Sequence, residues 1–179
     1  MLNKFFILAA GTIIMLVVMG KTGAILKTNT TPHGILNLEF ASNTQKVNAI
    51  LHAWQKNTTS NNIKAATINT LLDFIFLIFY SLFLNKLCNI IADKLSGLLV
   101  VAGRIIAYSA LAAGVLDIIE NTGMLLSLNG HINSETAIIT FTAASIKWLL
   151  VIAILLYVMV GGLIALVKKS NNKTSLSMP

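Results

Sequence analysis

Residues 148–167 form twenty consecutive positions without a charged side chain, and this stretch limits the possible folds more than any other feature. At a rise of about 1.5 Å per residue, a helix of roughly 20 apolar residues crosses the hydrocarbon core of a bilayer. Hydrophobic residues make up 56% of the 179 positions and charged residues 11%, against about 25% charged in soluble domains. One water-soluble core could not bury this much apolar surface, so the sequence predicts a polytopic membrane protein.

Four apolar runs predict four transmembrane helices, at about 5–20, 65–88, 95–128 and 136–167. The connections between the last three runs are short, so these helices should be antiparallel neighbours. We therefore expect an all-α fold, a four-transmembrane-helix antiparallel bundle in a single membrane domain over residues 1–179. A long first loop, residues 21–64, should lie outside the bilayer.

The first apolar run has two interpretations. Lys4 followed by an apolar stretch and by the small residues Gly20, Gly23 and Ala24 is also typical of a secretory signal peptide. No A-x-A-type cleavage site follows the run, which favours a retained helix. If residues 1–24 were cleaved, three spans would remain and the two termini would face opposite sides.

Lysines next to the apolar runs predict the orientation. One predicted side carries Lys4, Lys86, Lys94, Lys168, Lys169 and Lys173, close to the helix ends, whereas the lysines of the first loop are spread over more than forty residues. The positive-inside rule then places both termini in the cytoplasm. The net charge of +7 indicates an anionic bilayer surface as the partner rather than nucleic acid, because no soluble element carries a basic stripe.

Within the long loop, Val47, Ile50, Leu51 and Trp54 follow the spacing of an amphipathic helix, with Ser42 or Asn43 as its cap. This helix could be a lid over the outer end of the bundle. The interpretation that we favour places it on the lipid surface, with Trp54 as an interfacial anchor. Upstream, residues 34–41 alternate in polarity and predict an extended or turn segment.

Five charged residues interrupt the later apolar runs: Asp73, Arg104, Asp117, Glu120 and Lys147. Such charges cost several kcal/mol in a bilayer and persist when they are paired, hydrated or functional. On the second run, Asp73 should share one helix face with Asn69, Thr70, Tyr80 and Ser81, and that face should turn toward the bundle.

On the third run, the small residues Gly103, Ala107, Ala110 and Gly114 form a ridge that permits close helix packing. The same face continues to Asp117 and Asn121, with Glu120 beside them. Lys147 precedes the uncharged stretch, so we expect it at the outer boundary, paired with one of these carboxylates. Arg104 should point toward the cytoplasmic end.

These side chains suggest one site, a polar cavity in the outer half of the bundle, under the long loop. The predicted ligand-binding residues are Asp73, Tyr80, Asp117, Glu120, Asn121 and Lys147. The alternative is an ion-pair network that fixes the helix register and binds nothing.

Known catalytic motifs are missing from the chain. It has no HExxH motif, no phosphate-binding glycine loop and no serine elbow, and its one cysteine, Cys88, excludes a thiol pair. A metal on Asp117, Glu120 and His131 is conceivable, but no ligand spacing demands it. We therefore predict no metal and no cofactor, and whether the protein is an enzyme stays open.

Four segments resemble an uncharacterised group of small bacterial four-helix integral membrane proteins. The segments are Asn37–Ala41 (Asn-Leu-Glu-Phe-Ala), Leu51–Trp54, Leu72–Ser81 and Leu116–Asn121. They match an L-[DE]-F-A loop, a D-x-x-F-x-x-x-Y second helix and a D-x-x-E-N third helix. The resemblance implies the topology, and it supports Asp73, Tyr80, Asp117, Glu120 and Asn121 as site residues, but it implies no activity.

The sequence therefore predicts a multi-pass protein of the bacterial cytoplasmic (inner) membrane. Its predicted function is to bind a small amphiphilic or cationic ligand in an outward-facing acidic cavity. Two alternatives stay open: a lipid-modifying enzyme that uses Asp117 and Glu120 as paired carboxylates, or an accessory subunit that docks on a larger membrane protein complex.

Overall fold

The computed structural model of the protein describes residues 2–56 and 62–175, with side chains over 3–56 and 62–168. Its elements are α1 (Leu2–Gly23), the 3-10 turn η1 (Ala24–Leu26), α2 (Leu36–Glu39), α3 (Thr44–Gln55), α4 (Asn62–Ala92), α5 (Leu98–Leu128) and α6 (Ser134–Ser175). Four of these helices are long and apolar enough to cross a membrane: α1, α4, α5 and α6. The predicted all-α fold with four membrane-length helices is confirmed.

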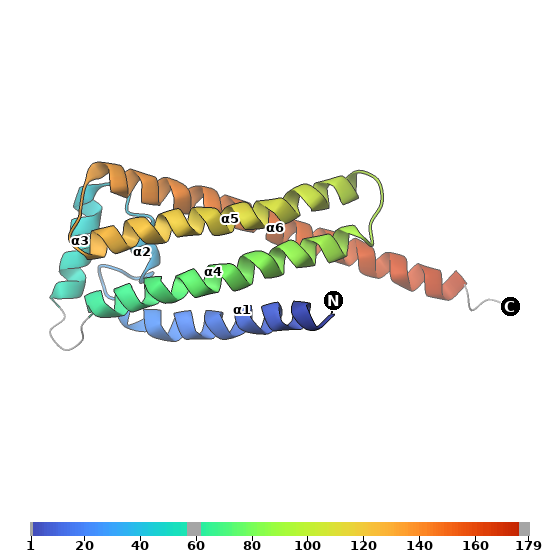
Figure 1. The fold of residues 1–179 in the computed structure, drawn as a ribbon, viewed down its shortest axis with the longest axis horizontal. Coiled ribbons are helices and arrows are strands. Elements are labelled where there is room, and N and C mark those ends of the chain that lie inside the picture. The colour runs from blue at the N-terminus through green and yellow to red at the C-terminus, as the bar shows by residue number, and fades with distance from the viewer. Residues whose placement is uncertain (1, 57–61, 176–179) are drawn as a thin grey trace.

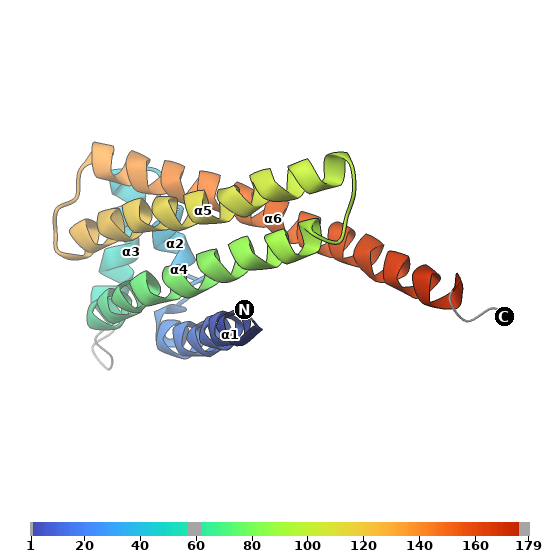
Figure 2. The same cartoon turned by 45° about the vertical axis from the view of Figure 1, so that its right-hand side comes forward.

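The four long helices pack as a bundle that is open between α1 and α6. α1 packs along α4, α4 along α5 and α5 along α6, and α4 also contacts α6, whereas α1 and α6 form no comparable interface. Figure 1 shows α2 and α3 at one end of the bundle, which we call the loop end, and the N-terminus at the opposite end. The last turns of α6 extend past the other helices at that opposite end, as Figures 1 and 2 both show.

The bundle has an apolar exterior, and its interior combines small and polar side chains with larger apolar ones such as Leu77, Leu84 and Ile154. Large hydrophobic side chains such as Leu149 and Leu163 on α6 are exposed. Helices approach closely where a side chain is missing: a Cβ on Gly114 would lie 3.0 Å from Ser81, and one on Gly123 would collide with Thr140. These two contacts bring α4 and α6 against the polar face of α5.

The amphipathic helix α3 lies across the loop end of the bundle. Its apolar residues Val47, Ile50, Leu51 and Trp54 are buried in one cluster with Ala66 of α4, Met124 and Leu128 of α5 and Ala137 of α6. The Trp54 side chain is 1% exposed, and its Nε1 donates to the Leu26 carbonyl oxygen at 3.0 Å and to Thr31 Oγ1 at 3.1 Å.

The prediction of Trp54 as an anchor in the lipid interface is therefore wrong, because α3 packs its apolar side against the ends of α4, α5 and α6. The apolar side of α3 is satisfied by protein, because the ends of α4, α5 and α6 offer it a matching apolar surface. Asn43 begins the helix as predicted, since its side chain accepts a hydrogen bond from Lys46 N.

Residues 34–41 also differ from the prediction. They contain the short helix α2 between two turns and no extended segment, because Gly34 turns the chain with a φ of +62° and the Glu39 N–H then donates to the Ile35 carbonyl at 3.2 Å. The helical turn points Leu38 and Glu39 into the protein, where both are buried. α2 thereby places a carboxylate from the loop against the bundle.

Candidate functional site

Lys147 is the centre of a buried ion-pair cluster. Its Nζ lies 2.9 Å from Asp117 Oδ1, 2.7 Å from Glu120 Oε2 and 3.7 Å from Glu39 Oε2. The side chain of Lys147 is 8% exposed, and those of Asp117 and Glu120 are 3% and 0% exposed. The predicted pairing of Lys147 with a carboxylate is confirmed, and the lysine pairs with both acids of α5.

The helix geometry explains why these groups meet. Asp117 and Glu120 stand three positions apart on α5, so both carboxylates face the same neighbour. The close approach at Gly123 and Thr140 brings α6, and with it Lys147, onto that face. From α4, the Tyr80 hydroxyl donates to Asp117 Oδ2 at 2.7 Å, so both oxygens of Asp117 have partners.

Glu39 is the member of the cluster that sequence reasoning missed. It comes from α2 and is 5% exposed, and its Oε2 also accepts a hydrogen bond from Trp148 Nε1 at 3.3 Å. Glu39 is the only acidic residue in the lysine-rich segment 21–64, and it stands between Leu38 and Phe40. A single carboxylate between two apolar residues was the feature of the sequence that could have indicated a buried role for Glu39.

Asp73 differs from the carboxylates that contact Lys147 because it forms no ion pair with any described side chain, although it is only 8% exposed. Its neighbour on α5 is Asn121, which is fully buried and whose side-chain amide interacts with the Asp73 carboxyl group. The buried Thr70 hydroxyl, one turn from Asp73, has no partner. Among the described residues, the Thr70 hydroxyl is therefore a buried polar group close to Asp73 that the protein leaves without a hydrogen bond.

A groove of about 430 Å³ opens beside this cluster, between α1 and α6. Its lining consists of Thr12, Leu16 and Met19 of α1, Glu39 of α2, Asp73, Phe76, Tyr80, Phe83 and Leu84 of α4, Asp117 of α5, and Lys147, Trp148, Val151 and Leu155 of α6. Most of these side chains are apolar, and the charged ones are Asp73 and three members of the ion-pair cluster, Glu39, Asp117 and Lys147. Figure 2 shows α1 standing apart from α6 on this side.

Four of the six predicted site residues line the groove: Asp73, Tyr80, Asp117 and Lys147. Glu120 and Asn121 belong to the same cluster but are fully buried behind it. The groove thus has apolar walls and a charged region, whereas the sequence suggested a polar cavity.

The apolar surface of α6 bears on the depth predicted for Lys147. Ile138, Ile139 and Ile146 are exposed on the loop-end side of Lys147, and Leu149 is exposed on its other side. Lys147 itself points inward, more than three turns from the start of α6. Exposed apolar side chains of α6 therefore lie on both sides of Lys147 along the helix, and its predicted position at the outer boundary of the bilayer stays a prediction.

A second, separate charge pair lies near the opposite end of the bundle. Arg104 Nη2 contacts Asp93 Oδ1 at 2.5 Å, and Arg104 Nη1 donates to Asn89 at 2.5 Å. The side chains of Arg104 and Asp93 are 46% and 60% exposed. The groove lining includes neither residue.

The described residues give no support to a metal site. Among them, no group of three His, Cys, Asp or Glu side chains could hold a metal ion. His131, which the sequence allowed as a ligand with Asp117 and Glu120, is exposed in the turn after α5, where its N–H donates to the Leu126 carbonyl oxygen.

The fold and the cluster define a class: a polytopic membrane protein with buried acidic residues paired with Lys147. No protein-family model matches this chain, and comparisons with curated proteins and with solved structures also found no match. The resemblance to a bacterial group therefore stays a prediction, and function has to be inferred from the site itself.

Proposed function

We propose that the protein binds an amphiphilic molecule with a cationic head group in the groove between α1 and α6. One observation carries the proposal: apolar walls from three helices meet the carboxylates of Glu39, Asp73 and Asp117 in one groove of about 430 Å³. An apolar lining with a few convergent polar groups is typical of small-molecule sites. The chain of the ligand would lie along Leu16 and Leu155, and its head would lie beside Asp73.

The charge balance of the cluster favours a cation. Three carboxyl groups, those of Glu39, Asp117 and Glu120, contact the ammonium group of Lys147, and the groove beside them is also lined by the carboxyl group of Asp73. Uncompensated negative charge is costly in an apolar interior, so it must be neutralised by protons or by a bound cation. Asp73 is the carboxyl that borders the groove and has no ion pair, and we assign the head group to it.

The arrangement of the helices supports entry from the side. Because α1 and α6 form no extended interface, the groove faces the lipid that surrounds the bundle. α2 and α3 cover the loop end, and Glu39 reaches from this cover to Lys147. An amphiphile dissolved in the bilayer could enter between α1 and α6 without crossing the loop layer.

We place the loop end outside and both termini in the cytoplasm, in a bacterial inner membrane, from the lysine distribution and the resemblance described above. The groove then opens in the outer part of the bilayer. The alternative of an enzyme with Asp117 and Glu120 as paired carboxylates has weaker support, because Glu120 does not border the groove and both acids bind Lys147.

Trp148 supplies a test, because it lines the groove and is one of only two tryptophans. Three brominated probes of equal chain length, an alkylamine, an alcohol and a carboxylate, are added to the purified protein in neutral detergent. The part of the tryptophan fluorescence quenching that is present in the wild type and absent in Trp148→Phe measures how much probe occupies the groove. We expect the amine to quench at the lowest concentration, and Asp73→Asn to abolish that preference.

The matched control is Glu135→Gln, which removes an exposed carboxylate at the start of α6, outside the groove. It should leave the amine preference intact. Equal quenching by the three probes, or an amine preference that survives Asp73→Asn, would contradict the proposal.

A further inference from the structure

A second groove, of about 500 Å³, lies between α2 and α3 on the loop layer. Polar side chains of His33, Asn37 and Lys46 and apolar side chains of Leu36, Phe40 and Ile50 line it. None of these residues belongs to the Lys147 cluster.

The surroundings of this groove are positively charged. The segment 21–64 contains five lysines and two histidines, and the structure describes all seven of these side chains as exposed. Its only acidic residue, Glu39, is buried in the Lys147 cluster and cannot offset them at the surface. Lys46 stands in the first turn of α3, which carries no acidic residue, so the helix dipole adds to the attraction for an anion.

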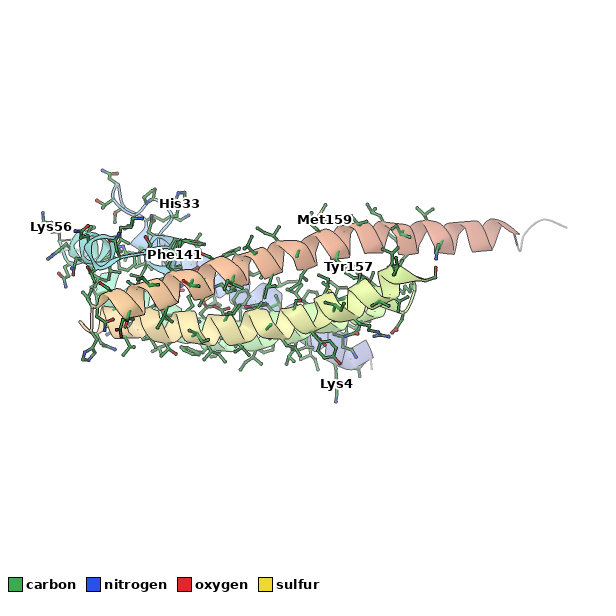
Figure 3. The ribbon with its side chains drawn as sticks, turned by 90° about the horizontal axis from the view of Figure 1, so that it is seen from above. Lys4, His33, Lys56, Phe141, Tyr157 and Met159 are labelled. Atoms are coloured by element: carbon green, nitrogen blue, oxygen red, sulfur yellow. The ribbon has the colours of Figure 1, made fainter. Side chains whose placement is uncertain are left out.

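The apolar side chains of the groove favour one kind of anionic partner, a lipid, over another, an acidic peptide. The Phe40 ring, which lines the groove, packs on Phe141 of α6 at 6.4 Å between ring centroids. Phe141 belongs to a helix whose neighbouring Ile138 and Ile139 are exposed and apolar. Figure 3 shows His33 and Phe141 at the loop end, on the side of the bundle rather than beyond its end. This position favours a lipid over a water-soluble acidic peptide.

We infer that the groove between α2 and α3 binds the anionic head group of a membrane lipid. The phosphate would lie near Lys46 and His33, and the glycerol and upper chain would lie on Leu36 and Phe40. Basic pockets beside membrane helices are known to hold anionic head groups. This inference is independent of the amphiphile groove, since it concerns other residues and a ligand of opposite charge.

Native mass spectrometry of the detergent-solubilised protein tests this inference with phosphatidylglycerol and phosphatidylcholine as probes. The wild type should retain phosphatidylglycerol in preference to phosphatidylcholine. Lys46→Gln should weaken that preference about fivefold, as expected for one basic charge near an anionic surface. Ala49→Phe, a change on the exposed side of α3 that fills the groove, should also weaken it while all charges are kept.

The matched control is Lys56→Gln, which removes an exposed lysine of the same loop outside the groove. Equal losses in Lys46→Gln and Lys56→Gln would show a general charge effect and overturn the site. Equal retention of the two lipids by the wild type would also overturn it. Displacement of phosphatidylglycerol by poly-glutamate but not by glycerol phosphate would favour an acidic protein partner instead.

Discussion

The two ends of the bundle use the same chemistry in opposite surroundings. Near the loop end, Lys147 contacts three carboxylates, and every side chain in that set is at most 8% exposed. Near the opposite end, Arg104 contacts one carboxylate, Asp93, and both side chains are about half exposed. A basic side chain contacts a carboxylate in both places, but only the Lys147 cluster is shielded from solvent by the surrounding protein.

The difference in solvent exposure determines how much each ion pair contributes to stability. Exposed ion pairs contribute about 0–1 kcal/mol, because water already solvates both charges. Breaking a buried pair costs about 3–5 kcal/mol, because the remaining charge stays without a partner in an apolar interior. The Lys147 cluster should therefore control folding and loop docking, and the Arg104 pair should not.

The largest effect is expected from Lys147→Met, which keeps the length of the side chain and removes its charge. Asp117, Glu120 and Glu39 would all lose their common partner. The free energy of unfolding, measured by steric trapping in bicelles, should fall by about 3–5 kcal/mol. Lys147→Arg keeps the charge and should recover part of this loss.

The matched variant at the other end is Arg104→Met. It removes an exposed pair, so the loss should stay below about 1 kcal/mol. Similar losses of unfolding free energy in Lys147→Met and Arg104→Met would contradict the expected difference between the two ends of the bundle.

A smaller effect is expected from Tyr80→Phe. The Tyr80 hydroxyl donates to Asp117 Oδ2 in the buried cluster, and a phenylalanine would leave that oxygen without its donor. Loss of a hydrogen bond to a charged group costs about 1.5–3 kcal/mol. The control is Tyr108→Phe on the exposed face of α5, which should leave the unfolding free energy unchanged.

Asp73→Asn should separate binding from stability within the cluster. Because Asp73 has no ion pair, the substitution removes a charge that no protein cation compensates at contact distance, and the protein should be at least as stable as the wild type. Amine binding should be lost in the same variant. A strong loss of stability would mean that Asp73 has a structural partner and is not a ligand-binding residue.

Much of the fold could be predicted because it follows from local patterns. Apolar runs fixed the four spans to within a few residues, except that α6 continues to Ser175. The polar face of the second run was correct: Asn69, Thr70 and Asp73 are buried. Helix periodicity alone determines which side chains share a face.

The missing parts depend on tertiary contacts. Trp54 is typical of an interfacial anchor, and only the ends of α4, α5 and α6 reveal that protein covers it. Glu39 lies more than a hundred positions from Lys147, and no local spacing connects the two. The groove arises because α1 and α6 do not close the bundle, which no single segment can show.

The smallest effect is expected between the two grooves. α2 forms a wall of both grooves. Leu36 and Asn37 line the groove between α2 and α3, and Glu39 lines the groove between α1 and α6. Bound phosphatidylglycerol should therefore change the amine concentration that half-quenches Trp148 fluorescence by at most about fivefold. A fivefold change is at the low end of the coupling that is observed between two binding sites. Lys46→Gln should remove this dependence, and a dependence that persists in Lys46→Gln would exclude α2 as the connection.

The most direct test of the amphiphile groove is photo-crosslinking with an alkylamine that carries a diazirine on its chain, followed by peptide mapping. The groove predicts labels on Leu16 and Met19 of α1 and on Val151 and Leu155 of α6, and their loss in Asp73→Asn. The outward face of α5, with Ile105 and Val115 exposed, is the internal reference for ordinary lipid contact. Labels spread equally over that face and the groove would contradict the account.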